Sequence, residues 1–114
     1  MAHRLALGVL LAAAAFTVHA DRPATALELF AQRDKGNCIA CHRLPAGVGP
    51  ATRSDLGPLL DGARMRSLGK PALREAIADP TKSNPETLMP PYGKHHILDS
   101  AEIDRLVDFL DALP

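Results

Sequence analysis

The spacing of apolar residues predicts three helices separated by two long irregular stretches. Apolar positions recur at helical intervals in residues 27–31, 73–77 and 103–110. The last segment is the clearest, because four residues follow the i, i+3, i+4, i+7 pattern: Ile103, Leu106, Val107 and Leu110. No segment shows the period of two that is typical of strands. The pattern therefore predicts an all-α domain.

Polar residues mark where these helices begin. Thr25 with Glu28, and Asp99 with Glu102, have the spacing of a capping box, in which each side chain satisfies an unpaired backbone N–H group. Pro71 suits the first turn of the middle helix, where its missing N–H group costs nothing.

Gly and Pro dominate the stretches between the helices. Residues 43–69 are interpreted as a wrapping loop with one short helical turn near residues 59–60. Asp79, which precedes a proline, ends the middle helix, and residues 81–96 form a second irregular stretch. Loops this long are uncommon in compact domains unless they enclose something.

The first twenty residues have the pattern of a secretory signal. His3 and Arg4 precede an apolar run over residues 5–18, and cleavage is expected after Ala20. The run is too short for a membrane span, although an uncleaved anchor is the alternative interpretation. We expect an exported, periplasmic protein whose single domain is residues 21–114 and which has no membrane span after cleavage.

This domain is poor in the side chains that fill a core. Residues 21–114 contain no Trp, and their aromatic residues are Phe30, Tyr92 and Phe109. A domain of this size buries only a thin core. A large flat apolar cofactor would supply the missing volume.

The charge pattern excludes one class of partner. The formal net charge is +0, from 13 basic and 13 acidic residues. Without a basic excess, binding to nucleic acid or to an anionic membrane surface is not expected.

Cys38, Cys41 and His42 form the Cys-x-x-Cys-His haem-attachment motif. Two cysteines three positions apart on a helical turn can each join one vinyl group of a haem, and the next residue then reaches the iron. The motif predicts one covalent haem c with His42 as an axial ligand.

Three other interpretations of the cysteines compete. A thioredoxin-like redox pair requires alternating strands and helices, which the pattern lacks. A zinc site requires further Cys or His ligands at suitable spacing. A disulfide between Cys38 and Cys41 would leave the thin core unexplained.

Met89 is the predicted second axial ligand. Pro90 and the proline after it hold Met89 in an extended, stiff segment that presents its sulfur without ordering a flexible chain. Met65 lies between two arginines, in what the sequence suggests is a polar setting. His95 and His96 are rival ligands, although their polar neighbours favour a solvated pair.

The second ring nitrogen of His42 needs a hydrogen-bond acceptor, because metal-bound imidazoles nearly always donate that proton. The backbone carbonyl of Pro58 is one candidate and that of Pro50 is the other. A His/Met pair fills both axial positions, so the iron is expected to pass single electrons without binding oxygen or peroxide. No catalytic residue is expected.

The order of these features resembles the class I cytochromes c over nearly all of residues 21–114. The resemblance implies three to five helices wrapped around one covalently attached haem. One feature departs from the family pattern. Phe30 lies eight positions before Cys38, and an insertion at residues 34–37 leaves open how the first helix packs on the last.

Residues 35–42 and 79–94 also resemble the SoxX family, the monohaem subunits of the SoxXA complex of sulfur-oxidising bacteria. This resemblance implies a heterodimer with a SoxA-like cytochrome subunit, which couples thiosulfate to the SoxYZ carrier protein. The chain would pass the released electrons to a soluble cytochrome c. It would be the electron-transfer subunit of an L-cysteine S-thiosulfotransferase.

Two alternatives remain. The first is a free-standing cytochrome c shuttle, for which a ring of lysines is expected around the haem edge. The chain has only four lysines: Lys35, Lys70, Lys82 and Lys94. The second is the haem subunit of another periplasmic dehydrogenase. Co-purification of a SoxA-like partner would distinguish the SoxX interpretation from both.

Overall fold

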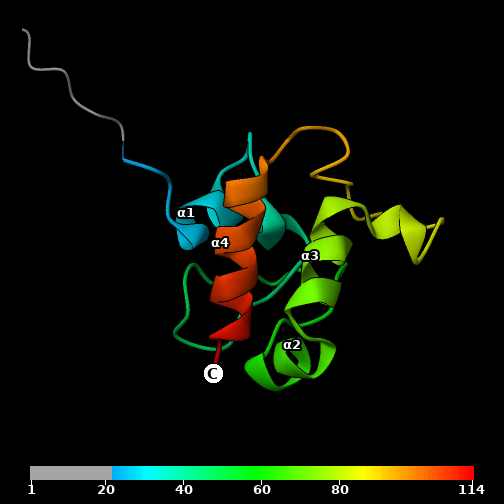
Figure 1. The fold of residues 1–114 in the computed structure, drawn as a ribbon. Coiled ribbons are helices and arrows are strands. Elements are labelled where there is room, and N and C mark those ends of the chain that lie inside the picture. Colours follow the sequence, from blue (N-terminus) through cyan, green and yellow to red (C-terminus); the bar gives the residue numbers. More distant parts are fainter. Residues whose placement is uncertain (1–21) are drawn as a thin grey trace, which may run out of the picture.

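The structure, a computed structural model, describes residues 22–114. The predicted signal, residues 1–20, lies outside this part. Its elements, in chain order, are α1 (Ala26–Ala31), the 3-10 helix η1 (Cys38–Ala40), α2 (Gly62–Leu68), α3 (Lys70–Ala78), the 3-10 helix η2 (Pro80–Lys82) and α4 (Ser100–Asp111) (Figure 1). The described part contains no strand, so the predicted all-α class is confirmed. Its helices are all too short or too polar to cross a membrane.

Both predicted capping boxes are present. The Glu28 amide donates to the Thr25 hydroxyl (3.2 Å), and the Thr25 amide donates to the Glu28 carboxylate (2.7 Å). At α4, the Glu102 amide donates to the Asp99 carboxylate (2.8 Å), and the Asp99 amide donates to the Glu102 carboxylate (2.9 Å). These bonds satisfy N–H groups that have no partner within the helix. Pro71 lies in the first turn of α3, as expected.

Helix α2 corrects the prediction of an irregular loop over residues 43–69. The chain forms no helical turn at residues 59–60 and instead begins a helix after Asp61, whose carboxylate accepts from the Arg64 amide (2.8 Å). Met65, on the inner face of α2, is only 2% exposed. The interpretation of Met65 as lying in a polar setting was wrong, because its side chain packs in the hydrophobic core while Arg64 and Arg66 remain exposed.

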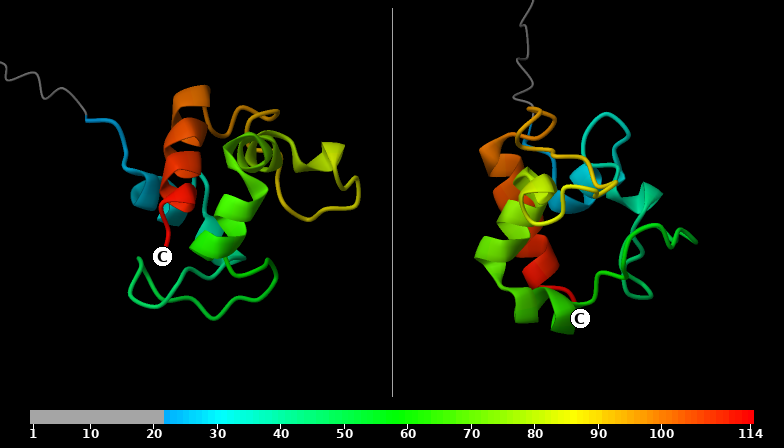
Figure 2. Two further views of the ribbon diagram at one scale, coloured as in Figure 1. Left: turned by 60° about the horizontal axis from the view of Figure 1, so that its bottom comes forward. Right: turned by 90° about the vertical axis from the view of Figure 1, so that its right-hand side faces the viewer.

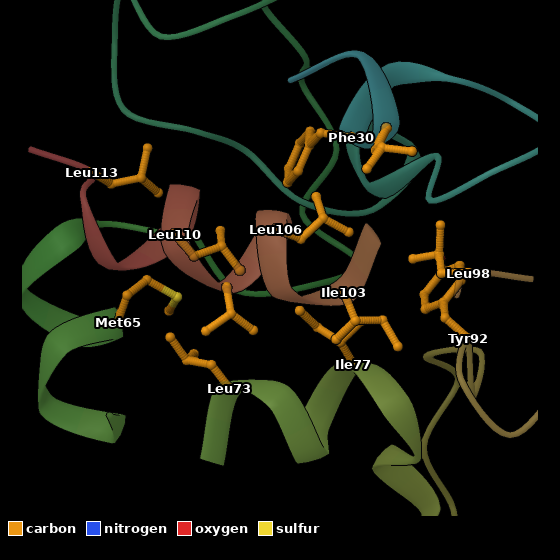
Figure 3. Close-up of a cluster of buried hydrophobic side chains, with 12 residues drawn as sticks. Phe30, Met65, Leu73, Ile77, Tyr92, Leu98, Ile103, Leu106, Leu110 and Leu113 are labelled. Atoms are coloured by element: carbon orange, nitrogen blue, oxygen red, sulfur yellow. The ribbon is translucent and has the colours of Figure 1, made fainter. Parts of the chain in front are cut away.

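Helix α4 is the centre of the core, and α1, α2 and α3 all pack against it. Figure 3 shows Met65, Leu73 and Ile77 on one side of α4 and Phe30 on the other. The Phe30 ring lies 6.2 Å from that of Phe109, at an angle of 59°. The first helix therefore packs on the last, which the sequence left open.

Residues 34–37, which the sequence suggested to be an insertion, form a turn that is bonded to both of these helices. The Gly36 amide donates to the Leu29 carbonyl at 3.1 Å. The Lys35 ammonium lies 2.8 Å from the buried carboxylate of Glu102. Asn37 then takes a left-handed conformation, with φ of 46°, and turns the chain into η1. This turn thus fixes the position of Cys38 at the start of η1.

Candidate functional site

A cavity of about 480 Å³ lies between the helical core and the irregular stretches. Figure 2 shows α3 and α4 on one side of this region and the segments around η1 on the other. The walls include Cys38, Cys41, His42, Met65 and Met89, and most of the remaining wall is apolar. Its volume is within the range of about 300–1,000 Å³ that is typical of ligand and cofactor sites.

One tight turn brings the haem-attachment motif to the cavity. The amides of Cys41 and His42 both donate to the Cys38 carbonyl, at 3.1 and 2.8 Å. The Thr52 hydroxyl donates to the Ile39 carbonyl at 3.0 Å and holds the turn from outside. This turn therefore places Cys38, Cys41 and His42 together in the cavity wall.

The electrostatics of the cysteines differ from those of a redox dithiol. Both thiols are free. The pKa of the Cys38 thiol is raised to about 12, mainly by burial; a backbone hydrogen bond partly offsets this effect, and the nearby Cys41 adds a smaller increase. Thioredoxin-like sites instead lower the pKa of one cysteine to form a thiolate. This environment argues against that interpretation.

Two neighbouring residues orient the His42 imidazole. Its Nδ1 lies 2.8 Å from the Pro58 carbonyl, which can only accept, so Nδ1 carries the proton and Nε2 keeps a free lone pair. Gly57 lies against the ring. A Cβ atom at Gly57 would come within 2.4 Å of Cε1, 2.6 Å of Nδ1 and 2.8 Å of Nε2. The ring is thus confined to an orientation in which Nε2 is available to a metal.

Met89 reaches the same cavity from a long loop and is half-buried. Its amide donates to the Thr87 hydroxyl at 3.1 Å. Beyond the two prolines, the amides of Tyr92 and Lys94 donate to the Ile77 and Ala78 carbonyls, at 3.2 and 3.0 Å. The loop is therefore anchored to the C-terminal end of α3 only a few residues after Met89.

The other candidate ligands occupy different surroundings. His95 and His96 are exposed and do not line the cavity. Met65 does line it, on the α2 wall, and sequence reasoning missed this placement. The sequence carries only a weak signal for this placement, because Met65 is a single apolar side chain on one face of a helix of seven residues.

The cavity residues fit a haem. They offer two thiols for its edge, an imidazole with a free Nε2, a thioether and extensive apolar walls. Soft sulfur and imidazole donors suit haem iron. Within residues 22–114, no three His, Cys, Asp or Glu side chains gather as ligands of a free metal ion would.

Comparisons with known proteins bear on the fold and the family. The model of the family described as cytochrome C oxidase, cbb3-type, subunit III matches residues 21–110. The crystal structure of SoxXA from P. pantotrophus is similar, with a TM-score of 0.65 and 23% identity over 76% of this chain and 77% of that chain. No curated protein matches the sequence significantly. At this level of identity the structural match establishes a shared fold, which is the class I cytochrome c fold that was predicted.

Proposed function

Because the chain belongs to the cytochrome family described as cytochrome C oxidase, cbb3-type, subunit III, we propose that it carries one covalently attached haem and transfers single electrons. The observation that carries this proposal is the convergence of Cys38, Cys41, His42 and Met89 on one cavity. A bound haem supplies a one-electron Fe(III)/Fe(II) couple.

The lining of the cavity supports a role for each of these residues. Cys38 and Cys41 would hold the haem through thioethers. His42 would provide Nε2 to the iron, and the Pro58 carbonyl fixes its ring by accepting from Nδ1. Met89 would provide the second ligand from its anchored loop. A haem held by these two ligands would supply electron transfer and would not activate oxygen or peroxide.

Within this class, we propose that the chain is a SoxX-type subunit. Two features support the assignment. Residues 35–42 and 79–94 resemble that family, and a solved structure with the same fold is titled SoxXA. The chain would then be exported to the periplasm by residues 1–20 and would pair with a SoxA-like subunit. It would accept electrons from thiosulfate coupling to a SoxYZ carrier and deliver them to a soluble cytochrome c.

A free electron carrier that serves a terminal oxidase is the second candidate. The family description names an oxidase subunit, and so connects this candidate with an oxidase as the electron acceptor. Isolation of the tagged chain from the periplasm of its native host during growth on thiosulfate separates the two. A stable SoxA-like cytochrome bound to the chain supports the first candidate, and a monomer supports the second.

Replacement of Met89 tests the site itself. We expect Met89→Leu to keep the haem-sized increment in the intact mass, since both thioethers remain. The same variant should lose the far-red absorption band of sulfur-to-iron ligation and have a lower reduction potential.

Met65→Leu is the matched control, because it removes the other thioether of the cavity with little change in volume. Met65→Leu should keep both the far-red absorption band and the reduction potential of the wild type. A band that survives in Met89→Leu and disappears in Met65→Leu would assign the ligand to Met65. An exported wild-type chain without a haem-sized mass increment would end the proposal.

A further inference from the structure

The cavity has one arginine in its wall, Arg64 from α2. The wall contains no lysine, and its other polar or charged residues besides the motif are Asn37, Asn84, Glu86, Thr87 and Tyr92. Two other arginines form ion pairs: Arg22 with Glu28, and Arg74 with Asp104. In residues 22–114 no carboxylate lies within ion-pair distance of the Arg64 guanidinium.

The backbone under Arg64 is well fixed. Its amide donates to the Asp61 carboxylate at 2.8 Å, and its carbonyl accepts from the Ser67 hydroxyl at 2.8 Å. Its neighbour Met65 is buried in the core. The Arg66 guanidinium ties α2 to the end of the chain by donating to the Leu113 carbonyl at 2.7 Å. Arg64 thus presents a cation to the cavity from a firmly docked helix.

A haem carries two propionate carboxylates, for which an unpaired cation in the cavity wall is a suitable partner. The vinyl edge of the porphyrin would be held by the thiols of Cys38 and Cys41 at η1. The two propionate carboxylates lie on the side of the ring away from the vinyl groups. The right-hand view of Figure 2 shows α2 well apart from η1, and both segments contribute residues to the cavity wall. The propionates would therefore lie towards the α2 wall.

Carboxylates in a mostly apolar cavity need a hydrogen-bonding cation, because burial of an unpaired charge is costly. A guanidinium binds a carboxylate through two parallel N–H···O bonds, which adds geometric selectivity to the charge. Glu86, on the wall formed by the Met89 loop, has the opposite effect and repels a carboxylate from that side. The distribution of charge along the wall thus favours the Arg64 end.

We propose that Arg64 binds a haem propionate and so fixes the orientation and charge of the cofactor. The inference rests on the proposed function, because it requires that the cavity hold a haem. It adds to that function a positioning residue outside the attachment motif and the axial ligands. The ion pair keeps the propionate ionised and partly neutralised beside the iron.

The test compares Arg64→Gln with Arg33→Gln, both in the exported protein with its haem. Arg33 is an exposed residue outside the cavity wall, so its replacement removes the same charge from the surface. We expect Arg64→Gln to lower the equilibrium constant for reduction about tenfold at neutral pH, since a charge-assisted bond near the iron is lost. The control should behave as the wild type does.

The pH dependence and the vibrational spectrum make the test specific. In Arg64→Gln the released propionate takes up a proton when the iron is reduced. The reduction potential should therefore fall with rising pH between about pH 5 and pH 8 more steeply than in the wild type. The resonance Raman bending mode of the propionates should shift in Arg64→Gln and not in Arg33→Gln.

Two outcomes would overturn the inference while the proposed function stands. One is a potential in Arg64→Gln equal to that of the control. The other is a changed potential with an unshifted propionate mode, which would show only a long-range effect of charge. Failure of the proposed function is separate, because the wild-type chain would then lack the haem mass and the far-red band.

Discussion

The imidazole of His42 is held by two neighbours that contribute no side-chain chemistry. The Pro58 carbonyl fixes Nδ1 at 2.8 Å, and the missing side chain of Gly57 leaves the space that the ring fills. A methyl group at Gly57 would lie 2.4–2.8 Å from three ring atoms, which is closer than any such contact allows. Backbone atoms alone therefore set the direction in which Nε2 faces the cavity.

Gly57→Ala should move the imidazole and weaken its bond to the iron. We expect a changed absorption spectrum and a loss of about 1–3 kcal/mol in the free energy of unfolding, the usual cost of overpacking. Spectroscopy of the purified holoprotein and denaturant titration measure these two effects.

Gly47→Ala is the control for the backbone effect of replacing a glycine by alanine. Gly47 has φ of 82° with no atom near its Cβ position, so alanine there strains only the backbone, by about 1–2 kcal/mol. Its spectrum should match that of the wild type. An unchanged spectrum in Gly57→Ala would contradict the argument that Gly57 sets the ring orientation.

Single residues differ in how far sequence alone could place them. The positions of Cys38, Cys41 and His42 could be predicted together, because all three belong to one five-residue motif. The choice between the carbonyls of Pro58 and Pro50 could not, since it depends on where a loop brings its backbone; the structure puts Pro58 beside His42. Arg64 gave no signal, because a charged residue in an assumed loop is expected to face solvent.

Among the elements, the Met89 loop depends on a small polar cluster at the end of α3. The Asp79 carboxylate accepts from the Thr81 hydroxyl and lies 3.5 Å from the Lys94 ammonium, just beyond the loop. The hydrogen bond from Thr81, and then the charge of Lys94, hold the pKa of Asp79 below its usual value against the effect of desolvation. The cluster joins the two ends of residues 79–94.

Asp79→Asn should remove a stabilisation that depends on pH in a defined direction. Because the folded-state pKa is lower than the unfolded one, this stabilisation is complete above the unfolded value of about 3.9. It is lost as the pH falls through the folded-state value. The variant should therefore be less stable than the wild type at neutral pH, and the difference should shrink in acid. Denaturant unfolding followed by circular dichroism at several pH values measures it.

Asp55→Asn is the comparison, because Asp55 is exposed and no hydrogen bond or ion pair joins it to another described residue. Its stability should follow that of the wild type at every pH. A difference between Asp79→Asn and the wild type that stays constant into acid would show that the charge of Asp79 is not the cause.

Helices with a clear amphipathic pattern were the predictable elements. Both capping boxes and the apolar stripe of α4 are local signals, and the structure confirms them. Helix α2 could not be predicted in the same way, because Arg64 occupies the position where a capping box needs Glu or Gln, and Met65 is its one large buried side chain. Its stability comes from tertiary contacts: Met65 packs in the core, and the Gly62 amide donates to the Pro114 carbonyl at 2.8 Å.

At the scale of the whole molecule, the hydrophobic core and the cavity share side chains. The buried apolar side chains gather around α4, and several of them, including Met65, Leu73 and Leu106, also form the cavity wall. The shortage of aromatic residues predicted a core that needs a cofactor, and the cavity has the volume for one. The surface ion pairs between α3 and α4, such as Lys70 with Asp108, contribute little by comparison.

The folded chain should therefore depend on its haem. Without the haem, the apolar side chains that line this open cavity face water, so the core loses apolar burial along one side. Small domains have a total stability of only about 5–15 kcal/mol. We expect the Cys38→Ala, Cys41→Ala double variant, expressed without haem attachment, to show no cooperative thermal transition by circular dichroism, whereas the holoprotein shows a sharp one. A haem-free chain that unfolds sharply, near the holoprotein's midpoint, would mean that the helices around α4 are stable on their own. The haem would then not be required for the core to be stable.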